Sequence, residues 1–328
     1  MFSFFRFPSL VYEEIIKCLD IEEMYNLSQC SKKSFRNVSI MVKRLNISFE
    51  LCLTDEFSLT VCHGHRTKFQ FESVFKLKGP RDQSTHHFCG SLFSKWWIRS
   101  KESVCKTYWI DPFQGFGIFF GQIRRLFEKP ISCVEYYNDF RYPVAEYDLL
   151  LEFINTIQPT IEKANVSFCR AYKIDIMISL NLFKTVRDMR WKTFVIREDE
   201  YPDVTHKYNH DTFAIKDGGT WLTIDHVLNM NCRIISIGEI ILTSDDLSNL
   251  LDAWMAGELP KLEHFAARVE DLDLFTVFKD VECKRMDDNV NFTIRNGPYL
   301  IEREFDGRNA IVFGTTSIEI LVLQEQLI

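Results

Sequence analysis

The residues best suited to chemistry lie in two short segments, Cys62-His63-Gly64-His65 and His86-His87-Phe88-Cys89. Thiolate and imidazole groups are side chains that zinc prefers, and four of them from two nearby segments would complete a tetrahedral site. The candidate metal ligands are Cys62, His63, His65, His86, His87 and Cys89. Their spacings match no standard zinc module, and the sequence has no Cys-x-x-Cys pair. The structural alternative is a hairpin turn and a polar loop with both cysteines packed as small apolar residues, so we expect no metal and no cofactor.

The same residue types could build a thiol hydrolase, in which a cysteine thiolate attacks and a histidine acts as base. Ten cysteines and eight histidines in 328 residues make chance pairs common, and reactivity needs a thiol whose pKa is lowered by its surroundings. The sequence has no phosphate-binding glycine loop, no Gly-x-Ser-x-Gly elbow and no His-Glu-x-x-His motif. We therefore predict a protein without enzymatic activity, and a Cys/His-based hydrolase or metal-dependent enzyme is the alternative.

The composition is that of a globular chain in a reducing compartment. Hydrophobic residues make up 46% and charged residues 26%, and 29 phenylalanines must find apolar surroundings. The longest stretches without a charged residue have twelve residues, whereas a membrane-spanning helix needs about 20 apolar residues. The net charge is −7 and no basic tract occurs, so we expect no nucleic-acid partner. The cysteine spacing and the missing membrane segment predict an intracellular protein, cytoplasmic or nuclear.

Three short helices are predicted at the N-terminus. Residues 9–19 carry apolar side chains with a helical period. Asp20 with Glu23 forms a capping box for a second helix, and Ser31 caps a third over Lys32–Met41. Three helices in about 40 residues bury too little surface to be stable alone. They either pack on the rest of the chain or complete their core against a partner.

Strands and helices alternate between residues 130 and 270. The expected strands are Ile131–Tyr136, Asn165–Cys169, Trp191–Ile196, Cys232–Ile237 and Leu262–Ala267. The expected helices are Tyr147–Ile157, Ile176–Met189 and Asp245–Ala256. The strand centres recur about every 28 to 40 residues, which is typical of stacked repeats. This pattern favours an irregular leucine-rich-repeat-like body of parallel strands with helices outside, and an ordinary doubly wound α/β domain is the alternative.

Antiparallel strands are expected on both sides of this region. Residues 46–80 contain the alternating segments Ile47–Leu53, Phe57–His63 and Lys68–Phe75. Residues 281–324 read as a meander with tight turns at Asn296-Gly297 and Asp306-Gly307. The expected fold class is therefore α+β with α/β: three N-terminal helices, then a repeat-like strand–helix body flanked by antiparallel β-hairpins.

The N-terminal helices resemble an F-box. Phe7-Pro8 stands where the family begins with Leu-Pro, Ile15-Ile16 and Leu19 match its Ile-Leu-x-x-Leu stretch, and Leu27-Ser28 with Cys30-Ser31-Lys32 matches its end. Phe7 replaces the usual Leu, and Phe35 lies close to a position where many members have Trp. The resemblance implies docking on a Skp-type adaptor and, through it, a cullin. The candidate adaptor-binding residues are Phe7, Pro8, Leu10, Ile15, Ile16, Leu19, Leu27 and Cys30.

The C-terminal part resembles the F-box-associated type 2 region of nematode F-box proteins. The resemblance is carried by the following segments: Trp221-Leu222-Thr223, Asp225-His226, Leu228, Leu242-Thr243, Asp246-Leu247, Trp254, Gly257, Pro260-Lys261-Leu262-Glu263 and Asp306-Gly307-Arg308-Asn309-Ala310. Together the two resemblances imply a substrate-recognition subunit of an SCF-type cullin–RING ubiquitin ligase, with an F-box over residues 1–45. Residues 46–328 would then bind an unknown protein substrate. A structural repeat protein whose helices only cap the core is a further alternative.

Overall fold

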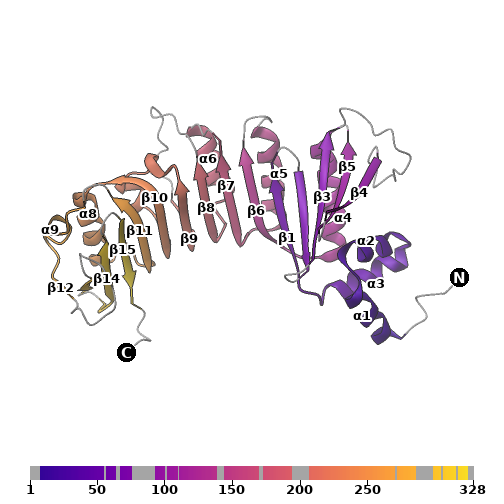
Figure 1. Ribbon diagram of the computed structural model, residues 1–328, viewed down its shortest axis with the longest axis horizontal. Helices are drawn as coiled ribbons and strands as arrows, with labels where there is room; N and C mark the ends of the chain where they lie inside the picture. Colours follow the sequence, from indigo (N-terminus) through magenta and orange to yellow (C-terminus); the bar gives the residue numbers. More distant parts are fainter. Residues whose placement is uncertain are drawn as a thin grey trace. The chain divides into compact units, whose positions relative to one another are not determined.

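The computed structural model describes most of the chain. The described residues are 8–54, 57–63, 67–75, 93–99, 102–109, 111–138, 144–169, 173–193, 207–269, 272–285, 298–303, 306–314 and 317–323. The chain divides into two compact units, Met1–Ile161 and Glu162–Ile328. Figure 1 shows the elements of both units in chain order. Among the helices in these ranges, none is long and apolar enough to cross a membrane.

The first unit begins with the three expected helices, α1 (Ser9–Cys18), α2 (Ile21–Gln29) and α3 (Lys32–Val42). The predicted capping box opens α2: Asp20 Oδ1 accepts from the Glu23 amide at 2.8 Å, and Glu23 Oε2 accepts from the Asp20 amide at 3.0 Å. Ser31 Oγ accepts from the Ser34 amide at 3.0 Å and caps α3 in the same way. The helix starts are thus set by contacts between residues three apart.

The sheet of the first unit has the strand order β6-β1-β2-β3-β5-β4. Its strands are β1 (Ile47–Leu53), β2 (Phe57–His63), β3 (Thr67–Phe75), β4 (Phe93–Arg99), β5 (Glu102–Trp109) and β6 (Ile131–Asn138). The expected antiparallel pairs β1–β2 and β2–β3 are present. β5 runs parallel to β3 and β6 runs parallel to β1. The sheet is therefore mixed, with two parallel pairs among its antiparallel ones.

Two further helices belong to this unit, α4 (Pro112–Phe127) and α5 (Val144–Ile157). The sequence pattern did not indicate α4, because three glycines interrupt its apolar period. Asp111 Oδ1 caps it by accepting from the Gln114 amide at 3.0 Å, and Pro112 occupies its first turn. Figure 1 shows α4 behind β3 and β5. The centres of the Phe119 ring of α4 and the Phe71 ring of β3 lie 4.1 Å apart.

The three N-terminal helices pack on this sheet rather than standing alone. Tyr25 of α2 is buried, and its ring meets the Phe71 ring of β3 edge-on at 5.6 Å. Ile21, Met24 and Val38 are buried in the same layer. Phenylalanines from β1, β2, β3 and α4 fill the adjoining core, which accounts for much of the phenylalanine content. These rings bury large apolar areas, the main source of stability in such a layer.

The sheet of the second unit has the strand order β12-β13-β14-β15-β11-β10-β9-β8-β7. The parallel strands are β7 (Lys163–Phe168), β8 (Asp188–Thr193), β9 (Thr212–Asp217), β10 (Ile234–Leu242) and β11 (His264–Val269). The antiparallel strands are β12 (Cys283–Arg285), β13 (Tyr299–Glu302), β14 (Asn309–Gly314) and β15 (Ser317–Val322). The intervening helices are α6 (Lys173–Leu182), η2 (Gly219–Trp221), α7 (Ile224–Leu228), α8 (Ser244–Met255) and α9 (Leu274–Val277). The expected mixture of strand–helix units and a C-terminal meander is present.

A leucine-rich-repeat character is not confirmed. The strands β7 to β11 are parallel and neighbours in chain order, but the helices between them differ in length. The sequence missed β9, which falls in the widest gap between expected strands and pairs with both β8 and β10. The expected strand over 290–295 lies outside the described residues.

The helix expected over Ile176–Met189 is too long. α6 ends at Leu182, and Met189 is a buried residue of β8. The Asp188 amide donates to the Glu162 carbonyl oxygen at 2.8 Å, which opens the pairing of β8 with β7. An apolar period alone does not show where a helix gives way to a buried strand.

Candidate functional site

The predicted adaptor-binding residues of α1 divide between its two faces. Pro8 is exposed, and its carbonyl oxygen accepts from the Val11 amide at 3.0 Å, so it starts the helix. Leu10 is 74% exposed, whereas Ile16 is 1% exposed and faces the core. Phe7 lies outside the described residues. Ile16 therefore holds α1 to its neighbours, and Leu10 is presented to solvent.

One face of α1 forms a shallow apolar groove, here called the α1 groove. It is lined by Leu10, Val11, Glu14, Ile15, Cys18 and Leu19. These positions recur every three or four residues, so their side chains share one face of the helix. Three of the predicted residues, Leu10, Ile15 and Leu19, therefore lie together. Leu27 and Cys30 do not line the groove: Leu27 is half-buried in α2, and Cys30 is exposed just after it.

Ion pairs flank the α1 groove. Arg44 Nη1 donates to Glu13 Oε2 at 2.7 Å, and Lys17 Nζ donates to Glu14 Oε1 at 2.9 Å. The Glu14 contact raises the pKa of Lys17, so the amine remains charged. These exposed pairs add little stability, but they leave charged groups beside an apolar groove. Such a surface suits a partner with an apolar centre and a polar rim.

The predicted metal ligands are only partly within the described residues. Cys62 is buried in β2 and His63 ends that strand half-buried. Because neighbouring strand residues point to opposite faces, these two side chains do not converge on one point. His65, His86, His87 and Cys89 lie outside the described residues. In the part of the chain that the structure describes, no group of three or more metal-ligating side chains occurs.

A buried cysteine and histidine do lie close together in the second unit, where the sequence did not indicate them. Cys232 Sγ lies 3.8 Å from the Tyr208 carbonyl oxygen, and burial raises the pKa of this thiol to about 11. His210 Nδ1 donates to the Val186 carbonyl oxygen at 2.7 Å, and burial lowers the pKa of this imidazole. A thiol with a raised pKa stays protonated and is a weak nucleophile, so this pair is suited to packing rather than to thiol catalysis.

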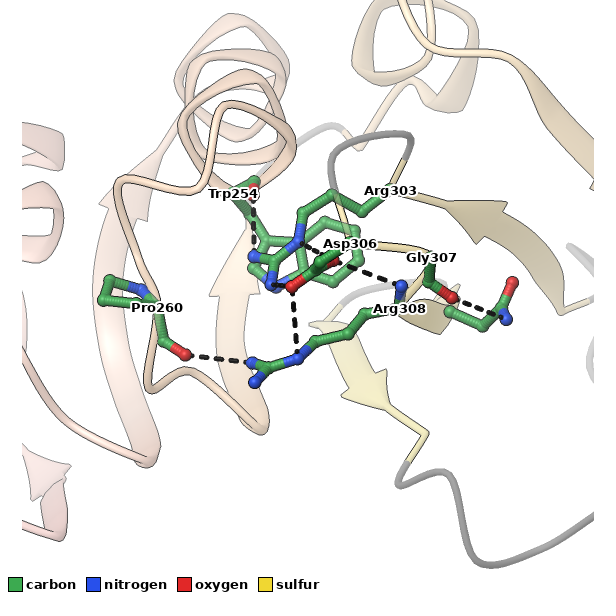
Figure 2. Close-up of polar contacts among 7 residues, drawn as sticks. Trp254, Pro260, Arg303, Asp306, Gly307 and Arg308 are labelled. Atoms are coloured by element: carbon green, nitrogen blue, oxygen red, sulfur yellow. Dashed lines mark hydrogen bonds and ion pairs between the residues drawn. The ribbon is translucent and has the colours of Figure 1, made fainter.

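The most concentrated polar cluster surrounds Arg303 (Figure 2). Arg303 is 1% exposed, and its guanidinium donates to both carboxylate oxygens of Asp306, with Nε to Oδ1 at 2.8 Å. Its Nη1 donates to the Trp254 carbonyl oxygen at 3.1 Å, and its Cζ lies 4.8 Å from the centre of the Trp254 ring. These contacts fasten the end of β13 to the last turn of α8.

Asp306 also joins a second arginine in this cluster. Arg308 Nε lies 3.3 Å from Asp306 Oδ2, and Arg308 Nη1 donates to the Pro260 carbonyl oxygen at 3.0 Å. The hydrogen bonds from Arg303 lower the pKa of Asp306 to about 2. The sequence indicated only the turn, which is confirmed by the positive φ of 70° at Gly307. No pattern within the sequence placed Arg303 against Trp254.

The comparisons with known proteins identify one segment. Residues 205–267 match the family model described as F-box associated. This segment includes β9, β10 and α8 and ends within β11. No curated protein and no solved structure matches the chain. The three N-terminal helices are consistent with an F-box. Residues 205–267 are therefore similar to the F-box-associated family.

Proposed function

We propose that this protein is the substrate-recognition subunit of an SCF-type cullin–RING ubiquitin ligase. Residues 1–45 would bind a Skp-type adaptor and, through it, a cullin, and residues 46–328 would bind a protein target. The match of residues 205–267 to the F-box-associated family supports this proposal, because a segment of that family is expected on a chain that also carries an F-box. The three short helices occupy the place in the chain where an F-box belongs.

The observation that carries the proposal is the α1 groove. Leu10 is 74% exposed and Val11 is 40% exposed, although both are large apolar residues, and they lie side by side on α1. Contiguous exposed apolar side chains mark interaction surfaces, and their burial in a complex stabilises it by about 25 cal/mol per Å² of apolar area. We therefore assign Leu10, Ile15 and Leu19 to the adaptor contact and Ile16 to the helix core.

The proposed role needs no catalytic group on this chain. Holding a target near the ubiquitin-carrying enzyme raises the effective concentration of the two reactants. The protein would then act without a cofactor and without enzymatic activity of its own. We expect it in the cytoplasm or nucleus, where such ligases operate.

The test is co-purification of the full-length chain with a Skp-type adaptor and a cullin. Leu10→Asp places a charge in the α1 groove at a position that contributes little to the core, so we expect a folded protein that no longer retains the adaptor. The matched control is Phe275→Asp, which adds the same charge at a side chain that is 92% exposed in the other unit. Equal adaptor recovery by the wild type and both variants would refute the proposed adaptor contact.

A further inference from the structure

A second groove in the first unit lies between α4 and α5, here called the α4–α5 groove. Its volume is about 640 Å³, and its lining includes Phe120, Gly121, Arg124, Arg125, Lys129 and Phe153. None of these residues belongs to the α1 groove or was singled out by the sequence. The groove is open to solvent. Its lining combines three kinds of group that recognise a partner: a glycine without a side chain, cations and apolar side chains.

The groove is open at Gly121 because this residue has no side chain. A Cβ built on Gly121 would meet no atom within 4 Å, and the same holds for Gly117 one turn earlier. Glycine is a poor helix former compared with alanine, and local packing does not require it at either position. The missing side chain at Gly121 lets another chain approach the backbone of α4 closely.

Three cations line the groove. Arg124 Nη2 donates to the Ile157 carbonyl oxygen at 3.1 Å, and Lys129 Nζ donates to the Lys43 carbonyl oxygen at 2.9 Å, so both charges lack a carboxylate partner in these contacts. Arg125 is exposed and has no hydrogen-bond or ion-pair partner within the described ranges. The lining carboxylate, Glu128, is neutralised by Lys43 Nζ at 2.6 Å. The lining is therefore net positive.

The α5 part of the groove lining includes an apolar side chain that is partly exposed. Phe153 of α5 lines the groove and is 45% exposed. Leu149, one turn earlier on the same face of α5, is 57% exposed. These side chains offer a docking surface for a large apolar side chain, about one helical turn from the cations.

We propose that the α4–α5 groove binds an acidic segment of a partner protein, with one large apolar side chain seated against Phe153 and carboxylates facing Arg124, Arg125 and Lys129. Charge complementarity argues for an acidic partner, and the exposed Leu149 and Phe153 argue for a protein. A nucleic acid is a poorer match, since three cations are fewer than the roughly 6–10 phosphate contacts of a typical nucleic-acid site. The inference stands whether or not α1 binds an adaptor.

The test is selection of a random-peptide display library against the full-length protein. We expect the enriched peptides to carry a large apolar residue next to Asp or Glu, and their binding to weaken as salt rises. Gly121→Trp fills the groove and Arg125→Glu reverses its unpaired charge, so each should weaken binding about tenfold or more. Circular dichroism of both variants checks that α4 remains folded.

Gly117→Trp is the matched control, because its side chain also enters open space on α4 but outside the groove lining. It should leave peptide binding unchanged. Failure to enrich any peptide, enrichment of peptides without acidic residues, or equal binding by wild type and Gly121→Trp would each overturn the proposal. So would displacement of selected peptides by a single-stranded RNA homopolymer at a lower concentration than an unlabelled acidic peptide.

Discussion

Arg303 and Asp306, three residues apart, form an ion pair in which two guanidinium nitrogens each donate to one carboxylate oxygen. A further hydrogen bond from the Arg303 guanidinium reaches the carbonyl oxygen of Trp254, 49 positions away in the chain. A buried charge is tolerated only while its partner is present. The pair therefore couples the β13–β14 connection to α8, which lies in the segment that matches the F-box-associated family.

Asp306→Asn should destabilise the second unit, because it removes the carboxylate that two nitrogens of the buried Arg303 guanidinium contact. Arg308→Ala removes a guanidinium that is 43% exposed, so it should lower the thermal midpoint by much less. Differential scanning calorimetry of both variants checks the order. An equal decrease of the thermal midpoint in the two variants would mean that the buried Arg303 side chain does not need the Asp306 carboxylate for the stability of this unit.

The loss of stability caused by Asp306→Asn should also depend on pH. Arg303 lowers the pKa of Asp306 from 3.8 to about 2 in the folded protein. The carboxylate therefore contributes its full stability above pH 3.8 and loses that contribution as the pH falls toward 2. The difference in unfolding free energy between wild type and Asp306→Asn should shrink over this interval, which urea titrations at several pH values would show.

His210 should make the second unit sensitive to mild acid. Burial lowers the pKa of its imidazole below the ordinary value of 6.5, so the unfolded chain binds a proton that the folded chain does not. The contribution of His210 to the unfolding free energy is complete above pH 6.5 and is lost as the pH falls from there toward the lowered pKa. Over this interval the unfolding free energy should change by at most about 1.4 kcal/mol per pH unit. Urea unfolding between pH 5 and 7.5 would measure this slope.

The control for His210 is His210→Gln, which keeps an amide donor for the Val186 carbonyl oxygen but does not titrate. Its unfolding free energy should depend less on pH across the same interval. An unchanged slope would assign the pH dependence to another group.

Two glycines of α4 should respond in opposite ways to the same substitution. Gly121→Ala should stabilise the first unit by about 0.5–1 kcal/mol, because the methyl group enters open space and alanine favours a helix. Gly115→Ala should destabilise it, since the added Cβ would overlap the buried ring of Trp109. Chemical denaturation of both variants tests the pair, and stabilisation by Gly115→Ala would contradict the packing of Trp109 against α4.

Tyr25 should be essential for the attachment of the N-terminal helices. Its ring is buried against Phe71 of β3, and truncation of a buried aromatic residue to alanine costs about 3–5 kcal/mol. Tyr25→Ala should therefore lower the unfolding free energy by about that amount. Leu10→Ala, at an exposed position on α1, should change it by less than about 0.5 kcal/mol. Similar losses of unfolding free energy in both variants would contradict the assignment of Tyr25 to the core and of Leu10 to an exposed docking surface.

Local features of this fold could be predicted from the sequence because they depend on residues close together in the chain. Asp20 with Glu23 forms the predicted capping box, and Thr243 with Asp246 forms the same arrangement at the start of α8. Gly257, just after α8, adopts the left-handed backbone that favours glycine, with a φ of 80°. The alternation of β1 between buried and half-buried residues follows the apolar pattern. Capping, tight turns and strand faces all involve contacts within about four residues.

Only the tertiary structure decided how these elements share their apolar surface. The sequence did not indicate α4, because glycines interrupt its apolar period. It also did not indicate β9, which is covered on both sides by neighbouring strands. It grouped Leu10 with Ile16, although one is 74% exposed and the other 1%. It also could not place Arg303 against Trp254. Each of these outcomes depends on which distant segment covers a side chain, and burial and ion pairing of that kind arise from contacts between residues far apart in the sequence.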